Sequence, residues 1–239
     1  MLYLSATGIK DHLDCAYRLY LRREKPESAI VSDDAIFGGI VHEGIEKYDT
    51  YDDALAFGLA EWDRLKNDNR FLPTKSKPPK SFRKMFKGYY NSILEEINAD
   101  GFEQAERELK FKIPWRKNEV MLVGKWDRVQ ENKLFDWKTG MRPPDKYDLR
   151  DFQFCFYDLA YELVYGQRPE QFYGYLYGGS LYPIDIPEQL RYNTVKLVDR
   201  VADELLEQNE PLRVTGYQCK RCFYREICHN ELDNRSIPA

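Results

Sequence analysis

The stretch 124–138, which reads GKWDRVQENKLFDWK, decides the fold of this chain. The segments 120–123 and 134–137, which flank its polar turn, are rich in β-branched and large apolar side chains. This pattern predicts a β-hairpin. Asp127 lies on the first arm of the hairpin and Asp136 on the second.

The charged side chains of this hairpin indicate a metal site. Asp136 and Lys138 are two residues apart and so share one face of a strand, while pairing across the hairpin brings Asp127 beside Asp136. Two adjacent carboxylates repel each other unless a cation lies between them, and their oxygens suit Mg²⁺ or Mn²⁺. Lys138 would then act on a metal-bound water or hold a phosphate oxygen. The alternative is an exposed hairpin with an ordinary cross-strand ion pair.

Composition limits the class of protein. A chain of 239 residues with 43% hydrophobic content can fill one large core. No apolar run approaches the length of about 20 residues that a membrane span requires, and the first residues lack a basic region followed by an apolar one, so we expect a cytoplasmic protein without a membrane anchor. The net charge of -4 excludes a protein that coats nucleic acid non-specifically, so any nucleic-acid site must be a local patch.

Hydrophobic periodicity predicts the other elements. Strands alternate with helices, and a helix follows the hairpin directly, which favours a sheet with helices packed on it. We expect helices over 6–22, 34–48, 52–66, 82–98, 149–165 and, with Pro187 at its first position, 187–208, and strands over 105–113, 172–177 and 181–186.

Two of these helices carry polar residues that need an explanation. His42 is either an ordinary structural histidine or a residue near a reaction centre, because neighbouring glycines allow close approach. Gln153 and Tyr157 are four residues apart, which places both on one face of their helix. Cys155 points elsewhere and is expected in the core.

A run of basic residues precedes and enters the helix predicted over 82–98. It contains no acidic residue, which is unusual in a chain that is acidic overall, and it is either a solvated face or a set of phosphate contacts. The residues with candidate phosphate contacts are Lys75, Lys77, Lys80, Arg83 and Lys84, and the run ends at Lys87.

Three cysteines near the end of the sequence have metal-ligand spacing. Cys219 and Cys222 form a C-x2-C pair, and Cys228 follows after five residues. A fourth ligand is needed: Cys15 would give four thiolates suited to [4Fe-4S] or zinc, whereas His229 would complete a local zinc site. Taken alone, Cys15 would be a small buried hydrophobe.

Together these motifs resemble the RecB-like branch of the PD-(D/E)XK nuclease superfamily. The cysteine pattern is similar to that of the iron-sulfur nucleases of the AddB type and of CRISPR-associated exonucleases. The resemblance extends over nearly the whole chain, although Trp126 stands where the superfamily has its proline. It rests on motifs in the family's order, namely Cys15, His42, Asp127, Asp136-Trp137-Lys138, Gln153-x-x-x-Tyr157 and Cys219-x2-Cys222-x5-Cys228.

The resemblance implies a role for each of these residues. His42, Asp127 and Asp136, with the backbone carbonyl of Trp137, would hold Mg²⁺ or Mn²⁺, and Lys138 would act on the attacking water. The remaining motif residues divide into two groups: Gln153 and Tyr157 would contact DNA and support the site, and Cys15, Cys219, Cys222 and Cys228 would ligate a [4Fe-4S] cluster.

The resemblance also implies a fold and a function. We expect an α/β, restriction-endonuclease-like core with a central mixed β-sheet flanked by helices. Residues 1–239 would form one nuclease domain, with 1–30 and 210–239 joined as an iron-sulfur subdomain and 50–100 as a helical insertion. The activity would be metal-dependent hydrolysis of DNA, as an exonuclease on single strands or ends. A helicase, recombination or CRISPR-adaptation partner is expected, since the chain lacks G-x-x-x-x-G-K-[ST]. The alternative is a non-catalytic DNA-binding module with a structural Zn²⁺ site.

Overall fold

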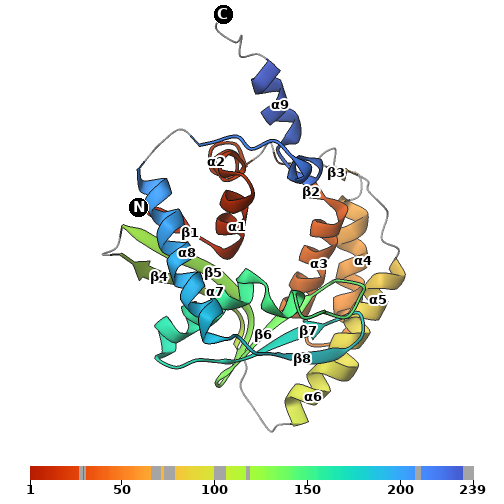
Figure 1. The fold of residues 1–239 in the computed structure, drawn as a ribbon. Coiled ribbons are helices and arrows are strands. Elements are labelled where there is room, and N and C mark those ends of the chain that lie inside the picture. The colour runs from red at the N-terminus through yellow and green to blue at the C-terminus, as the bar shows by residue number, and fades with distance from the viewer. Residues whose placement is uncertain are drawn as a thin grey trace, which may run out of the picture.

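A mixed β-sheet forms the centre of the molecule in the computed structural model (Figure 1). The structure describes residues 1–26, 29, 31–65, 71–72, 79–99, 106–116, 119–207 and 211–233. In these residues the six strands of the sheet are β1 (Leu2–Leu4), β4 (Glu106–Trp115), β5 (Val120–Gln130), β6 (Lys133–Lys138), β7 (Glu170–Tyr175) and β8 (Ser180–Ile184). A separate pair joins β2 (Val31–Ser32) to β3 (Phe71–Leu72).

The sheet has the order β1-β5-β6-β7-β8, and β4 pairs with the other edge of β5. Strand β5 is parallel to β1 and antiparallel to β4 and β6, while β7 is parallel to β6 and antiparallel to β8. The expected mixed α/β fold is therefore confirmed. Strand β1 was not predicted, because three residues are too short for a recognisable alternating pattern.

The hairpin of β5 and β6 has the predicted position and a tighter turn. Arg128 pairs with Phe135 and Gln130 with Lys133, so only residues 131 and 132 form the turn. Glu131 has a positive φ of 50°, as short hairpin turns require. One step beyond the paired ladder, the same register places position 127 opposite position 136.

Helices cover one face of the sheet and form the first core with it. Its fully buried side chains include Leu4 and Trp126 from the strands and Phe156, Tyr161 and Val198 from helices. Burial of these large apolar groups is the main stabilising contribution of this layer. The helices are α1 (Ala6–Asp14), α7 (Phe152–Tyr165) and α8 (Glu188–Leu206).

A second helical layer packs on the opposite face of the sheet. Phe37, Phe82, Phe86 and Tyr89 of this layer meet the strand residue Trp137 in one core. The layer consists of α3 (Asp33–Lys47), α4 (Tyr51–Leu65), α5 (Pro79–Gly88), a π-helical segment Tyr89–Ile93 and α6 (Leu94–Ala99). In Figure 1, α3, α4 and α5 stand on the opposite side of the sheet from α1 and α8.

Three expected helices differ in detail. The helix predicted over 6–22 breaks at Cys15, whose extended backbone (φ -168°, ψ 110°) separates α1 from α2 (Ala16–Glu24). The break follows from burial, because Asp11 at the end of α1 is buried and accepts ion pairs from Arg18 and Arg22 of α2. The helix predicted over 82–98 contains the π-helical segment. Pro187 is the N-cap of α8 instead of its first residue.

Helix α2 and the C-terminal segment from residue 211 to residue 233 lie together, away from the sheet (Figure 1). Tyr17 and Leu21 of α2 form a small core with Tyr224, next to a 3-10 turn over Tyr217–Arg221. The last described helix is α9 (Arg225–Asp233). No helix in the described ranges is long and apolar enough to cross a membrane.

Candidate active site

The side chain of Asp127 on β5 contacts both α3 and β6. The side chain is nearly buried, and its Oδ1 lies 3.1 Å from Nδ1 of His42 on α3. Its Oδ2 accepts a hydrogen bond of 2.7 Å from the backbone N–H of Trp137 on β6. Because the side chain of Trp137 is buried in the core beneath α5, this strand, and with it the Asp127 carboxylate, is held rigidly.

Asp136 of β6 lies in a second group of contacts, on the side of α7. Its Oδ2 is 2.5 Å from Nζ of Lys138, as expected for residues two apart on a strand. Lys138 also donates a hydrogen bond of 2.9 Å to Oε1 of Gln153. The amide nitrogen of Gln153 lies 3.4 Å from Oδ1 of Asp136 and 3.0 Å from the hydroxyl of Tyr157.

The structure therefore brings together the motif residues from four elements, α3, β5, β6 and α7. The motif residues form two groups of contacts that the backbone of Trp137 joins, one of His42 and Asp127 and the other of Asp136, Lys138, Gln153 and Tyr157. Tyr157 is buried, with 9% of its surface exposed, and its hydroxyl contacts Gln153, which fits support of the site.

Burial and charge shift the pKa values of the two carboxylic acids in opposite directions. Burial by itself raises the pKa of Asp127, but the charge of His42, its hydrogen bond and the Trp137 N–H outweigh it, so the pKa is lowered. Burial and the charge of Asp127 raise the pKa of Asp136 despite the nearby Lys138. The pKa of Lys138 is itself raised, because Asp136 and Asp127 outweigh the effect of burial.

The donor set fits a divalent cation. Oδ2 of Asp136 is buried and accepts no well-directed hydrogen bond, and only its charge contact with Lys138 compensates it. A buried oxygen of this kind is rare unless it binds an ion or a water. In the described part of the chain, no three His, Cys, Asp or Glu side chains are gathered around one point as ligands of a metal.

Sequence reasoning missed three residues beside the site. Glu46, Lys125 and Arg128 line a cavity of about 10 Å³ together with His42 and Asp127. Arg128 is 4% exposed and donates to Gln130 Oε1 and to the Tyr89 hydroxyl. The sequence places two of these residues next to motif positions, since Glu46 follows His42 by one helical turn and Arg128 follows Asp127 directly. This spacing could have predicted that they lie beside the site.

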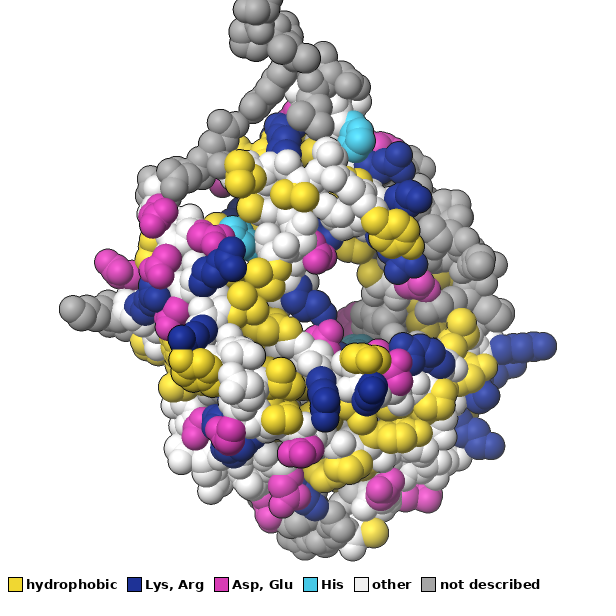
Figure 2. Space-filling model, in the orientation of Figure 1, with side chains coloured by type: hydrophobic (Ala, Val, Ile, Leu, Met, Phe, Trp, Pro, Cys, Tyr) yellow, Lys and Arg dark blue, Asp and Glu magenta, His cyan; other side chains and the backbone are white. Residues whose placement is uncertain are grey.

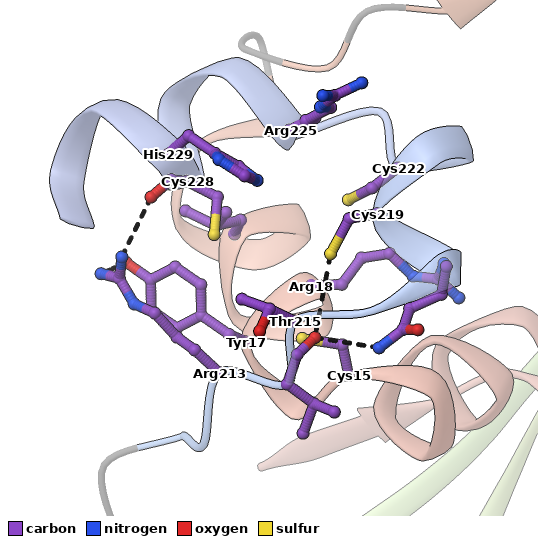
Figure 3. Close-up of a pocket in the computed structure, with 13 residues that line it drawn as sticks. Cys15, Tyr17, Arg18, Arg213, Thr215, Cys219, Cys222, Arg225, Cys228 and His229 are labelled. Carbon is purple, nitrogen blue, oxygen red and sulfur yellow. Dashed lines mark hydrogen bonds between the residues drawn. The ribbon is translucent and has the colours of Figure 1, made fainter. Parts of the chain in front are cut away.

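The four motif cysteines line one cavity of about 30 Å³ between the two ends of the sequence. Figure 3 shows their sulfur atoms around a common space, with Cys15 on the side of α2 and the other three on the C-terminal segment. His229, the alternative ligand, lines the same cavity. Burial raises the pKa of the thiols of Cys222 and Cys228.

A polar cluster holds the walls of this cysteine cavity together. Arg213 lies 3.8 Å over the ring of Tyr17 and donates hydrogen bonds to the Tyr17 hydroxyl and to the backbone oxygen of Cys228 (Figure 3). It also donates a hydrogen bond to Glu231. Lys25 adds an ion pair of 2.7 Å to Glu231. The bonds from Tyr17 and Lys25 to Glu231, and from Arg213 to Tyr17, join residues about 200 positions apart, so no local sequence pattern predicts them.

The basic run is described only in part. Lys75 and Lys77 lie outside the described residues. Lys80, Arg83 and Lys84 are exposed on α5, and in the described residues no hydrogen bond or ion pair joins them to the residues around Asp127. Cys155 is buried in α7, as expected.

Two solved structures resemble this one. A crystal structure from Eubacterium rectale, named "Putative exonuclease", is 14% identical and has a TM-score of 0.58, with 99% of this chain and 90% of that chain covered. The structure of SSO0001 is 16% identical and has a TM-score of 0.44, with 95% and 86% covered. No curated protein matches the chain. The likeness to the E. rectale structure shows a shared fold.

A protein-family comparison matches nearly the whole chain. The family model of the PD-(D/E)XK nuclease superfamily covers residues 3–229. This range includes the hairpin carboxylates, Lys138, the α7 motif and all four cysteines of the cavity. The chain therefore belongs to the PD-(D/E)XK nuclease superfamily.

Proposed function

We propose that this protein is a metal-dependent deoxyribonuclease that hydrolyses phosphodiester bonds as an exonuclease on single strands or DNA ends. One observation carries the proposal: Asp127 and Asp136 lie opposite each other, nearly buried, beside a lysine that Gln153 holds in place. Membership of a nuclease superfamily supports the reaction class. The name of the E. rectale neighbour agrees with an exonuclease.

The carboxylate network would hold the catalytic cation. Asp127, Asp136, His42 and the backbone carbonyl of Trp137 are the ligands in this proposal. When bound, Mg²⁺ or Mn²⁺ would polarise the scissile phosphate and lower the pKa of a water. The imidazole of His42 favours Mn²⁺, since nitrogen donors suit Mg²⁺ less well.

The residues around this cation would have separate roles in the reaction. Lys138 would hold the attacking water or a phosphate oxygen through its ammonium group, in place of its present contact with Asp136. Gln153 accepts a hydrogen bond from Lys138 and so fixes the direction of Nζ. The hydroxyl of Tyr157 accepts a hydrogen bond from Gln153 and would help to hold it in place. Tyr157 is too buried for wide contact with a DNA strand.

Cleavage assays with end-labelled DNA test the assignment. We expect the wild-type protein to degrade single-stranded DNA with Mn²⁺ or Mg²⁺ and not with EDTA, and Asp136→Asn and Lys138→Ala to lose at least about a hundredfold in rate. Lys196→Ala, at an exposed lysine of α8, is the control and should cleave normally. Undiminished cleavage by both site variants, with normal circular dichroism, would exclude these roles. The labelled end gives the polarity, and an RNA of the same sequence tests the preference for DNA.

We propose further that Cys15, Cys219, Cys222 and Cys228 ligate a [4Fe-4S] cluster. All four line one cavity beside α2 and the C-terminal segment. Four thiolates around one space are a ligand set that suits a [4Fe-4S] cluster. It would join residues 1–30 and 210–239 into a subdomain of a single nuclease domain over 1–239, with 50–100 as a helical insertion.

A second candidate function rests on His229. Because His229 lines the cysteine cavity, it could complete a structural Zn²⁺ site in a non-catalytic DNA-binding module. Anaerobically purified protein separates the two candidates. A brown sample with absorbance near 400 nm and about four irons per chain supports the cluster. A colourless protein with one zinc that binds DNA without cutting it supports the alternative.

The proposed activity also implies a setting for the protein. Since the sequence has no P-loop signature, unwinding would come from a helicase, a recombination complex or a CRISPR-adaptation complex in the cytoplasm. Co-purification of tagged protein from its own host tests this expectation, and recovery of no such partner would contradict it.

A further inference from the structure

The exposed side of α5 carries a row of cations that the proposed active site does not use. Lys80, Arg83, Lys84 and Lys87 follow each other at helical spacing and are all exposed. The positions between them, from Phe82 to Tyr89, are mostly buried in the second core. All four cations therefore project to the same side.

These cations have no acidic partners in the described part of the chain. No ion pair or hydrogen bond connects any of the four to a carboxylate, whereas Arg18, Arg116 and Arg191 each bind two or more. Figure 2 shows dark blue side chains gathered on the flank where α5 lies, at the right of the view. The chain has a net charge of -4, so this uncompensated positive face is local.

The basic face is built rigidly onto the proposed active site. Gly88 ends α5 against the turn after β7, where a Cβ atom would lie 2.0 Å from the backbone oxygen of Leu176. Next in the chain, the Tyr89 ring packs on Trp137, with centroids 5.3 Å apart, and Trp137 lies between Asp136 and Lys138. The position of the basic face relative to the hairpin is thus fixed by direct packing.

Lys84 of this face packs on Tyr177, a residue that follows β7 in the chain. Its Nζ lies 3.9 Å from the ring centroid of Tyr177. Tyr177 follows β7, in which Tyr175 pairs with Lys138 in register. The cation is therefore kept within reach of the strand that carries the proposed catalytic lysine.

We propose that this side of α5 binds the phosphates of a nucleic-acid strand outside the active site, so that affinity increases with strand length. The inference rests on the proposed function. Lysine and arginine side chains about 5–6 Å apart along a helix can neutralise successive phosphates without reading bases. A partner of this chemistry fits a surface with cations and no apolar pocket better than a protein partner with a hydrophobic core does.

Equilibrium binding in EDTA tests the proposal without any cleavage. The probes are fluorescein-labelled single-stranded DNAs of 30 and 6 nucleotides, and the variant is Lys84→Gln with Lys87→Gln. We expect affinity for the 30-mer to fall about tenfold and affinity for the 6-mer to change less than about twofold. The slope of log K against log salt for the 30-mer should decrease by about 1.4, since each lost contact with a single strand contributes about 0.7.

A matched control has Lys196→Gln with Lys220→Gln, two lysines that also lie over tyrosine rings, at 4.6 and 5.2 Å. It should bind both DNAs as the wild type does. An unchanged 30-mer affinity and salt slope in the α5 variant, or an equal loss in the control, would overturn the inference. Unchanged DNA binding with lost binding to polyglutamate would assign the face to an acidic protein instead. A wild-type protein that binds DNA but never cuts it would contradict the proposed function only.

Discussion

At the scale of single residues, the site depends on two carboxylates with different surroundings. Asp127 has two directed donors, His42 and the Trp137 N–H, and its pKa is lowered. Asp136 has Lys138 as its main counter-charge and feels the charge of Asp127, and its pKa is raised. A divalent cation between them would favour the ionised form of both. The two carboxylates therefore differ in how their charge is compensated.

Gln153→Leu should lower the rate of cleavage more than it changes substrate affinity. The variant removes the acceptor that fixes Lys138 Nζ, and the ammonium then swings toward Asp136 alone. We expect kcat to fall about tenfold to a hundredfold, with KM within about threefold. The acidic limb of the pH-rate profile should also shift, a change that mere loss of stability would not produce. Gln189→Leu on α8 is the control, and an unchanged kcat in Gln153→Leu would contradict the positioning role.

At the scale of elements, the long helical segment from α5 to α6 is fitted to the turn after β7. Gly88 allows the helix backbone to touch the backbone of Leu176, and the π-helical segment begins at the next residue. The wider turn brings Tyr89 onto Trp137, while Tyr90 donates a hydrogen bond of 2.6 Å to the Tyr48 oxygen. Insertions of this type recur near functional sites, and this one adjoins the proposed metal ligands.

Gly88→Ala should lower the free energy of unfolding by about 3 kcal/mol, because the new methyl group meets a backbone atom that cannot rotate away. Gly39→Ala is the matched control in an exposed position of α3 with nothing within 4 Å of the new Cβ, and it should gain up to about 1 kcal/mol from helix propensity. Urea titrations of both variants provide the comparison. Equal stability of the two would show that α5 does not dock as closely as described.

At the scale of the whole molecule, residues from the two ends of the sequence close the structure. Glu231 of α9 accepts from Tyr17, Lys25 and Arg213, and these contacts lower its pKa from 4.5 to about 2. Burial and the bond to Glu231 raise the pKa of Tyr17 to about 12. Because the cysteine cavity lies beside this cluster, the cluster holds the proposed ligands from both ends in reach of each other.

Glu231→Gln should destabilise the protein at neutral pH by about 1 kcal/mol, a modest effect because the group is partly exposed to solvent. The pKa of Glu231 is lower in the folded state, so its contribution is complete above pH 4.5 and is lost as the pH falls toward 2. The difference in melting temperature between wild type and variant should therefore be present at pH 7 and shrink below pH 4. A difference that stays constant down to pH 3 would argue against this ion cluster. Glu226→Gln, at an exposed position of the same helix α9, is the control for loss of one negative charge.

The sequence alone determined most of the long elements and the positions of the motifs. Apolar periodicity predicted α3, α4, α7 and α8 to within a few residues, because a helix face must be apolar where it is buried. The hairpin around Asp127 and Asp136 was also predictable, since a short turn and a side-chain period of two leave little freedom in register.

Only the tertiary structure decided how distant segments meet. The contact of His42 with Asp127 and the cluster around Glu231 depend on partners far away in the sequence. So does the close docking of Gly88. Local patterns record which face of an element is apolar, but a hydrogen bond or ion pair between remote side chains depends on the packing of whole layers. That packing gave the separate motifs of this nuclease-superfamily chain one common site.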